Sequence, residues 1–361
     1  MKQVVGLSLL FVLGVLFLSQ TIFRTTSTKT IVPTSPSLTP LGKSTIRVPQ
    51  KEYQYLFVPY WSLTGKKIPS DSYDELIYFG IAPDEKGLNT SEIGYKNIDK
   101  FLSALAAREK RFLTIRMIDP KVDPLVLEDK ALQTNIIDQS IVTAKKFGFD
   151  GIVLDFELSA LSFSSVVKNI SDFYIVFAKS VKEKNLQFYI TLYGDTFYRA
   201  RPYDVKVIGE YADKVLILAY DFHKARENPG PNFPLHGKDV YGYDFPSMIN
   251  DFTKALPKQK LVVVFGMFGY DWKIDSQQRG ITTASPFSFY AMKEKFVTHC
   301  IFTDCVVKRD DLSSETSVRY TDSDSQKHIV WFEDMESVAK KKQFLQEKGM
   351  YEVSFWAYSY F

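Results

Sequence analysis

The sequence contains few of the side chains from which metal and redox centres are built. It has two cysteines and four histidines among its 361 residues, and no second Cys pair or His pair stands at ligand spacing. We therefore predict that the chain has no metal site. The two cysteines, Cys300 and Cys305, either close a small hairpin disulfide in an oxidising compartment or remain two buried thiols. The sequence leaves both alternatives open.

The chain also lacks an excess of charge of either sign. Lysine and arginine total 45, aspartate and glutamate total 42, and the formal net charge is +3. A balance this even gives no reason to expect nucleic acid as a partner. Aromatic residues make up 15% of the chain, and most of them are expected in the core. A surplus of Tyr and Trp also suits a carbohydrate site, because sugar rings stack on aromatic planes, and composition does not separate the two.

One long apolar run is present, at the N-terminus. Val4 to Leu18 carries no charge, and the stretch up to Phe23 extends the run to about 20 residues, or roughly 30 Å of helix, the thickness of the hydrocarbon layer. No Ala-x-Ala site follows, which disfavours a cleaved signal peptide. We predict that residues 1–23 form a transmembrane signal anchor with the N-terminus inside. A cleaved signal peptide is the alternative, and it also places the rest of the chain outside the cytoplasm.

Residues 24–50 are rich in Ser, Thr and Pro and show no apolar periodicity. This composition predicts a flexible linker between the membrane and residues 51–361. We therefore expect a single-pass protein of the cell membrane with an extracytoplasmic domain, or a secreted one if the first segment is cleaved. The chain is expected to be a monomer.

Beyond the linker, short apolar runs alternate with helical patterns. Near-continuous β-branched and aromatic runs are typical of strands that are covered on both faces. Eight of them predict a (β/α)8 barrel. An open doubly wound sheet is the alternative, but it would need a Gly-rich phosphate loop after the first strand, and the sequence has none. The expected strands are residues 55–61, 75–81, 112–118, 151–157, 186–193, 215–220, 261–266 and 353–356. Expected helices include 98–108, 132–147, 166–184 and 335–349, and residues 273–328 are expected to form an insertion.

The fourth strand ends in two carboxylates. Catalytic groups of a barrel lie at the C-terminal ends of its strands. With a side-chain period of two, Val153, Asp155 and Glu157 point to one side, which we expect to be the barrel mouth. Two neighbouring, partly desolvated carboxylates repel each other, so the pKa of at least one should rise, as a general acid requires. A structural ion pair is the alternative interpretation.

Further strand ends carry residues that suit a binding site. The sixth strand ends in Tyr220-Asp221, and the eighth ends in Trp356. Taken alone, Tyr-Asp is usually a capped loop and a strand-end Trp usually belongs to the core.

Together these features resemble glycoside hydrolase family 18, the chitinase and endo-β-N-acetylglucosaminidase family. The family's fourth-strand signature, Asp-Gly-x-Asp-x-Asp-x-Glu, is similar to residues 150–157, and its Met-x-Tyr-Asp motif is matched in part by 218–221. Its Tyr-Gly-x-x-Trp motif resembles 268–272, and its last strand carries a Trp, here Trp356. The tail, including 328–334, is similar to the bacterial branch of spore-cortex-lytic enzymes.

The resemblance implies a retaining mechanism assisted by the substrate, acting on β-1,4-linked N-acetylglucosamine polymers such as peptidoglycan or chitin. Glu157 would protonate the glycosidic oxygen, Asp155 would orient the 2-acetamido group, and Tyr220 would hydrogen-bond its carbonyl oxygen. No metal or organic cofactor is implied. The predicted substrate contacts are Tyr60, Asp150, Tyr193, Asp221, Trp272 and Trp356.

Two positions depart from the family pattern. Val153 stands where the family usually has Asp or Asn, the residue that shares a proton with the next Asp. The third strand reads Thr114-Ile115-Arg116-Met117-Ile118-Asp119 in place of Ser-x-Gly-Gly. These departures keep a second hypothesis open, a catalytically impaired barrel that binds carbohydrate.

Overall fold

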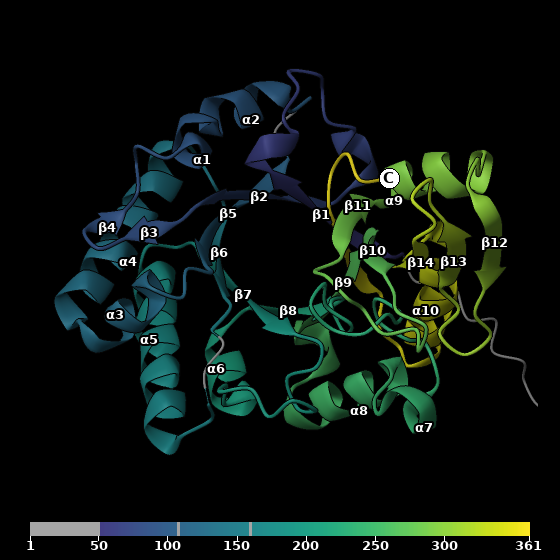
Figure 1. Ribbon diagram of the computed structural model, residues 1–361. Coiled ribbons are helices and arrows are strands. Elements are labelled where there is room, and N and C mark those ends of the chain that lie inside the picture. Colours follow the sequence, from purple (N-terminus) through teal and green to yellow (C-terminus); the bar gives the residue numbers. More distant parts are fainter. Residues whose placement is uncertain (1–50, 107–108, 159–160) are drawn as a thin grey trace, which may run out of the picture. The chain divides into compact units, whose positions relative to one another are not determined.

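The computed structural model describes residues 51–106, 109–158 and 161–361 (Figure 1). The predicted anchor, 1–23, and the predicted linker, 24–50, lie outside the described residues. Within the three described ranges, no helix is both long and apolar enough to cross a membrane.

A closed barrel of eight parallel strands forms the centre of the described part of the chain. The strands follow one another around the barrel in chain order, and the last one pairs with the first. Each strand predicted from the sequence corresponds to one of them, so the (β/α)8 prediction is confirmed and the open sheet is wrong. The barrel strands are β1 (Tyr53–Pro59), β2 (Glu75–Ile81), β5 (Lys110–Met117), β6 (Gly151–Phe156), β7 (Gln187–Tyr193), β8 (Lys214–Ala219), β9 (Leu261–Gly266) and β15 (Glu352–Trp356).

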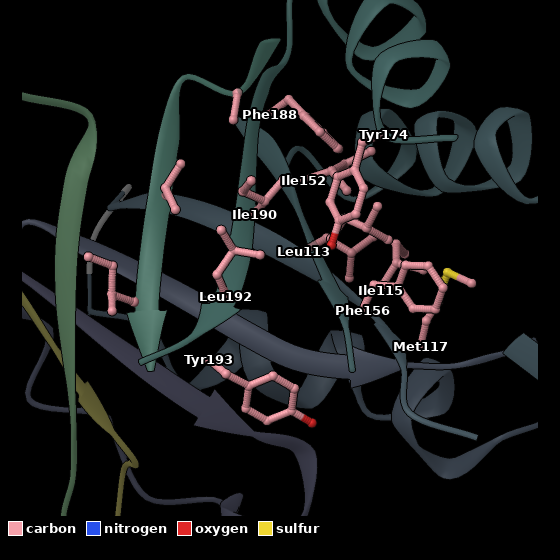
Figure 2. Close-up of a cluster of buried hydrophobic side chains, with 14 of the residues drawn as sticks. Leu113, Ile115, Met117, Ile152, Phe156, Tyr174, Phe188, Ile190, Leu192 and Tyr193 are labelled. Carbon is pink, nitrogen blue, oxygen red and sulfur yellow. The ribbon is translucent and has the colours of Figure 1, made fainter. Parts of the chain in front are cut away.

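The strands are buried on both faces, which explains their continuous apolar runs. In β6, Ile152, Leu154 and Phe156 join the large outer core beneath the helices, whereas Val153 belongs to a smaller cluster inside the barrel. Figure 2 shows the outer core where side chains of β5, β6 and β7 meet Tyr174 of helix α5 (Ser164–Glu183). Because side chains alternate along a strand, this arrangement leaves the carboxylates of β6 for the inside.

Helices cover the outside of the barrel, with α4 against β5 and β6 and α5 against β7 (Figure 1). Aspartates set several helix starts: Asp129 accepts two backbone N–H groups at the start of α4, and Asp334 forms a capping box with Ser337 in α10. Besides α5, the helices are α1 (Ile93–Lys96), α2 (Ile98–Ala104), α3 (Val122–Glu128), α4 (Lys130–Lys146), α6 (Val205–Tyr211), α7 (Lys238–Tyr241), α8 (Phe245–Ala255), α9 (Phe289–Met292) and α10 (Met335–Glu347). Short 3-10 turns span Tyr60–Ser62, Ser70–Ser72 and Lys258–Lys260, and a π-helical turn spans Lys293–Thr298.

The insertion between β9 and α10 is an antiparallel sheet in the order β11-β10-β14-β13-β12. It has its own small core, which includes Phe296, Val318 and Phe332. Cys300 and Cys305 form a disulfide, which settles the alternative that the sequence left open. The sheet begins and ends a few residues beyond the predicted limits of 273 and 328, because β10 pairs with β14 along its length. Its strands are β10 (Phe268–Lys273), β11 (Ser285–Ser288), β12 (Thr303–Arg309), β13 (Thr316–Thr321) and β14 (Lys327–Phe332), and a separate hairpin pairs β3 (Pro83–Asp84) with β4 (Gly87–Leu88).

Candidate active site

A cavity of about 400 Å³ lies at the mouth of the barrel, where the C-terminal ends of the strands meet. Five of the residues predicted from the sequence line this cavity together: Asp155, Glu157, Tyr220, Asp221 and Trp356. Trp61, Tyr270 and Phe287 add aromatic surface to its wall. A concave site that combines aromatic planes with paired carboxylates is suited to a sugar ring.

Glu157 directly follows β6 and is fixed by its neighbours on both sides. Its backbone N–H donates to the carbonyl of Met117 at 2.8 Å. The hydroxyl of Tyr193 donates to its Oε2 atom at 2.5 Å. Burial raises the pKa of the Glu157 carboxyl, while the Tyr193 hydrogen bond and the charge of Lys224 lower it. The net rise in pKa favours a protonated carboxyl, the form that a general acid needs.

Asp155 lies two residues earlier on the same face of β6 and is buried. The hydroxyl of Thr191 donates to its Oδ1 atom. Burial and the charge of Glu157 hold the pKa of Asp155 well above its usual range, while Thr191 and Arg116 act in the opposite direction. Arg116 stands beside Asp155 in the register of the neighbouring strand, and its guanidinium also pairs with Glu92.

Tyr220 and Trp356 form the aromatic part of the site. The ring of Tyr220 lies 6.5 Å from that of Trp356, measured between centroids. Trp356 packs edge-on against Phe79 at 4.7 Å and lies 6.2 Å from Trp61. Burial and the charges of Glu157 and Asp155 raise the pKa of the Tyr220 hydroxyl well above its usual value, so this hydroxyl keeps its proton and acts as a donor.

The loop after β8 is held by a chain of buried polar groups. The residue Asp221 has a φ of 57°, a conformation that few side chains other than Asn and Asp adopt. Its backbone N–H donates to Asn232 Oδ1 at 2.8 Å, and its own carboxylate accepts from the Tyr270 hydroxyl at 2.7 Å. The backbone N–H of Asn232 in turn donates to Glu315 at 2.6 Å, and Glu315 pairs with Lys341 at 3.0 Å. These hydrogen bonds and this ion pair connect the loop beside Tyr220 to the insertion and to α10.

Three predicted substrate contacts do not line this cavity, and for two of them, Asp150 and Trp272, the structure corrects the sequence-based prediction. Asp150 stands at the opposite end of β6 and accepts the backbone N–H of Arg111 at 2.9 Å. Trp272 is fully buried in the insertion, in a cluster with residues such as Ile329. The ring of Tyr60 faces the guanidinium of Arg116 at 5.4 Å.

Tyr193 does not line this cavity either, but it lies next to Glu157. It holds the carboxylate of Glu157, and it lines a second cavity beyond that residue rather than the first one. Its ring is also covered by two cations, Arg201 at 3.6 Å and Lys224 at 4.7 Å from the centroid.

Sequence reasoning missed Thr191, Arg116 and Trp61. Thr191 could have been found from the period of two along β7, since it alternates with the outward-facing Ile190 and Leu192. In the sequence Arg116 is only a departure from the family pattern, whereas in the structure its charge lowers the pKa of Asp155. Among the described residues, no group of three or more His, Cys, Asp or Glu side chains is placed to hold a metal ion.

A known protein family and several solved structures resemble this chain. The model of the family described as glycosyl hydrolases family 18 matches residues 57–360. The cortical fragment-lytic enzyme of Bacillus anthracis is 26% identical over 243 residues, which cover 64% of this chain and 51% of the relative. The chain spans about half the length of the first curated relatives that it matches.

Two solved structures are similar in fold. The spore cortex-lytic enzyme SleL of Bacillus cereus aligns with a TM-score of 0.70 and 19% identity, over 86% of this chain and 72% of that one. A class V chitinase from Nicotiana tobaccum in complex with NAG4 aligns with a TM-score of 0.71 and 16% identity, over 85% of this chain and 94% of that one. Because the family model covers most of the described residues, the chain belongs to glycosyl hydrolase family 18.

Proposed function

We propose that the barrel hydrolyses β-1,4-linked N-acetylglucosamine polysaccharides, of the peptidoglycan or chitin type, with retention of configuration. The observation that carries this proposal is the placement of Asp155 and Glu157 on one face of β6, in the same cavity as Tyr220 and Trp356. A sugar ring stacked on the indole of Trp356 presents its anomeric carbon to both carboxyl groups and to the phenol.

In the first step, Glu157 gives its proton to the glycosidic oxygen, and the bond from that oxygen to the anomeric carbon breaks. The carbonyl oxygen of the substrate's own 2-acetamido group forms a bond to the same carbon, which yields an oxazolinium ion. Asp155 faces the acetamido nitrogen and stabilises the positive charge, and the Tyr220 hydroxyl donates to the acetamido oxygen.

In the second step, the carboxylate of Glu157 takes a proton from a water molecule. The oxygen of that water bonds to the anomeric carbon, and the oxazolinium ring reopens to the acetamide. Two displacements at one carbon restore its original configuration. The raised pKa of Glu157 suits the first step, and the Tyr193 hydrogen bond steadies the carboxylate that the second step uses.

A binding barrel without catalysis is the second candidate, and Val153 is the observation that favours it. Its side chain is fully buried inside the barrel and offers no polar atom to Asp155. Asp155 nevertheless has a hydroxyl donor in Thr191 and a nearby positive charge in Arg116, which supports the hydrolase.

The proposed substrate class is supported by the NAG4 complex of the tobacco chitinase and by the relatives named for the spore cortex. We propose that the barrel acts outside the cytoplasm, held to the cell membrane by residues 1–23. The disulfide between Cys300 and Cys305 supports an oxidising compartment, because such bonds are rare in reducing ones.

The test compares the full chain with its Glu157→Gln variant, both purified in detergent. Each is incubated with purified peptidoglycan and with chitin oligosaccharides, and new reducing ends are identified by mass spectrometry. We expect products from the wild type alone, with oligosaccharide binding retained in both proteins by calorimetry. Equal turnover by Glu157→Gln contradicts the assignment of the acid. Binding by both proteins without any product favours the binding barrel.

A further inference from the structure

Strand β11 forms one edge of the insertion sheet and part of the wall of the candidate active site. The sheet order is β11-β10-β14-β13-β12, so within the described residues β11 has a neighbouring strand on one side only. In Figure 1 it lies on the side of the insertion nearer the barrel, whereas β12 lies on the far side. Pro286, Phe287 and Ser288 of β11 line the cavity that holds Asp155 and Glu157. An unpaired strand edge therefore borders the space that the proposed substrate occupies.

The pairing of β11 with β10 determines which of its backbone groups face outward. The N–H of Phe289 donates to the carbonyl of Met267 at 2.9 Å, and the antiparallel register of β11 and β10 continues from this pair. In such a pair, residues that bond to the neighbouring strand alternate with residues whose backbone groups point away from it. Phe287 therefore faces β10, whereas the carbonyl of Pro286 and the N–H of Ser288 point outward. The proline agrees with this assignment, because a residue without an N–H is tolerated where that group would face away from the sheet.

Other segments of the chain close this edge at both ends but not in the middle. Before β11, the N–H of Ala284 donates to the carbonyl of Ala225 at 2.8 Å. After it, the N–H of Tyr290 donates to the carbonyl of Tyr360, also at 2.8 Å. Between these two contacts, the carbonyl of Pro286 and the N–H of Ser288 have no partner in any other described segment. The unpaired part of the edge coincides with the part of β11 that lines the cavity.

The two unpaired groups fit one extended amino-acid residue. An acceptor and a donor two residues apart on one strand edge bond the N–H and the C=O of a single residue in an added strand, because an extended residue presents both groups on the same side. The 2-acetamido group of a sugar does not have this arrangement, since the N–H and the C=O of a trans amide point in opposite directions. The chemistry of the edge therefore favours a peptide over the sugar itself.

We propose that the unpaired edge of β11 binds the peptide of peptidoglycan by strand addition. One residue of that peptide donates its N–H to the carbonyl of Pro286 and accepts the N–H of Ser288 with its own carbonyl. Peptidoglycan carries short peptides on the lactyl groups of its N-acetylmuramic acid units, whereas chitin carries none. This inference rests on the proposed hydrolase function and deepens it, because it names the peptide-bearing glycan as the preferred one of the two proposed polymers.

Ser288→Pro removes the donor of this contact with little other change to the backbone. Ser288 has a φ of −63°, the value that proline requires, and the residue before it lies in a strand, as a residue before proline prefers. The substitution also removes the Ser288 hydroxyl, which accepts the N–H of Ala291 at the start of α9. Ser288→Ala is the matched variant, because it loses the same cap and keeps the N–H. The difference between the two variants therefore isolates the N–H.

The first experiment compares two tetrasaccharides of alternating N-acetylglucosamine and N-acetylmuramic acid on the full-length wild type and both variants. In one substrate the lactyl groups carry L-alanine methylamide, and in the other they end in a methylamide, so both are neutral and differ by one amino-acid residue. We expect the wild type to prefer the L-alanine substrate by about 10-fold or more in kcat/KM, as two hydrogen bonds allow. Ser288→Pro should reduce this preference by about 3- to 10-fold relative to Ser288→Ala.

Three outcomes overturn the inference. The first is equal cleavage of both substrates by the wild type, and the second is the same preference in Ser288→Pro and Ser288→Ala. The third is a fall in Ser288→Pro, relative to Ser288→Ala, by one factor on both substrates, which shows that the edge binds the sugar. Failure of the proposed function is recognised separately, because the wild type then cleaves neither substrate. In that case calorimetry decides: the inference requires tighter binding of the L-alanine substrate to the wild type and to Ser288→Ala than to Ser288→Pro.

The second experiment changes the ligand instead of the protein. N-Methyl-L-alanine in place of L-alanine removes the N–H that donates to the carbonyl of Pro286 and should lower kcat/KM of the wild type by about 3- to 10-fold. Equal cleavage of the N-methylated and parent substrates contradicts the inference. Sedimentation of the wild type and Ser288→Pro tests a different occupant, a second copy of the chain. A dimer that Ser288→Pro disrupts would show that the edge pairs with that copy and would also overturn the inference.

Discussion

Replacing Tyr193 with phenylalanine tests the electrostatic account of Glu157, the proposed catalytic acid. The change removes one hydroxyl and keeps the buried ring. That hydroxyl donates to Glu157 Oε2 at 2.5 Å and stabilises the carboxylate form, so it lowers the pKa of Glu157. Without it, burial dominates and the pKa of Glu157 rises. Because the first step requires the protonated acid, the alkaline limb of the pH–rate profile should move to higher pH.

The magnitude follows from the bond that is lost. A hydrogen bond to a charged group contributes about 1.5–3 kcal/mol, and one pKa unit corresponds to about 1.4 kcal/mol. The full effect is therefore about 1–2 pKa units. Lys224 remains beside the carboxylate and continues to lower its pKa, so we expect a shift near the lower end, about 1 unit.

The assay is the pH dependence of kcat on 4-methylumbelliferyl chitobioside, with the Glu157 carboxyl also titrated directly by carbon NMR of glutamate-labelled protein. Tyr290→Phe is the matched control, because that tyrosine is 61% exposed and does not line the cavity. The reasoning is refuted if the alkaline limb of Tyr193→Phe stays in place, or moves to lower pH, while the protein remains folded.

Two further substitutions test the support of the site. Lys341→Met leaves the buried carboxylates of Glu315 and Glu333 without their cation and should lower the free energy of unfolding by about 3–5 kcal/mol in a denaturant titration; a loss below about 1 kcal/mol contradicts the structural role of this charge cluster. Val153→Asn places an amide in an apolar, fully buried position and should cost about 1–3 kcal/mol of stability while changing kcat by less than about 3-fold. A gain in kcat of tenfold or more would show that Asp155 lacks a partner that it needs.

The barrel could be predicted from the sequence because its strands are uniform. Each run is short, apolar and rich in β-branched or aromatic residues, and helical patterns separate the runs. Alternation along β6 then places Asp155 and Glu157 inside, since Ile152, Leu154 and Phe156 need the outer core. The position of a residue along its strand and the alternation of side chains between the two faces were sufficient to predict this part of the site.

Motif matching alone was less informative about individual contacts. Asp150 and Trp272 both fit family motifs. Asp150, however, precedes its strand and therefore lies at the end of the barrel opposite the mouth. Trp272 follows the point where the chain leaves the barrel for the insertion, and the pairing of β10 with β14 buries it there. A motif gives spacing along the chain, whereas the substrate contact depends on where the strand ends.

Contacts between strands could not be predicted, because one sequence does not determine the register of parallel strands. Arg116 stands next to Asp155 only because β5 and β6 pair in this register, and Tyr193 reaches Glu157 from the neighbouring β7. The second cavity, which Glu157 and Tyr193 line, has the same origin, because only packing brings α3 and α5 together beside Glu157.

The departure at Val153 and the presence of Arg116 are best understood together. In the family pattern, the carboxyl or amide at position 153 shares a proton with the next Asp. Here the neighbouring strand β5 carries the guanidinium of Arg116, and the hydroxyl of Thr191 donates a hydrogen bond to Oδ1 of Asp155. The charge of Arg116 lowers the pKa of Asp155 and so opposes burial and the charge of Glu157, which together hold that pKa well above its usual range, and the Thr191 donor keeps the carboxyl group in one orientation. The oxazolinium ion of the proposed reaction places a positive charge beside this carboxyl group and favours its ionised form, so an apolar residue at 153 is compatible with the proposed catalysis.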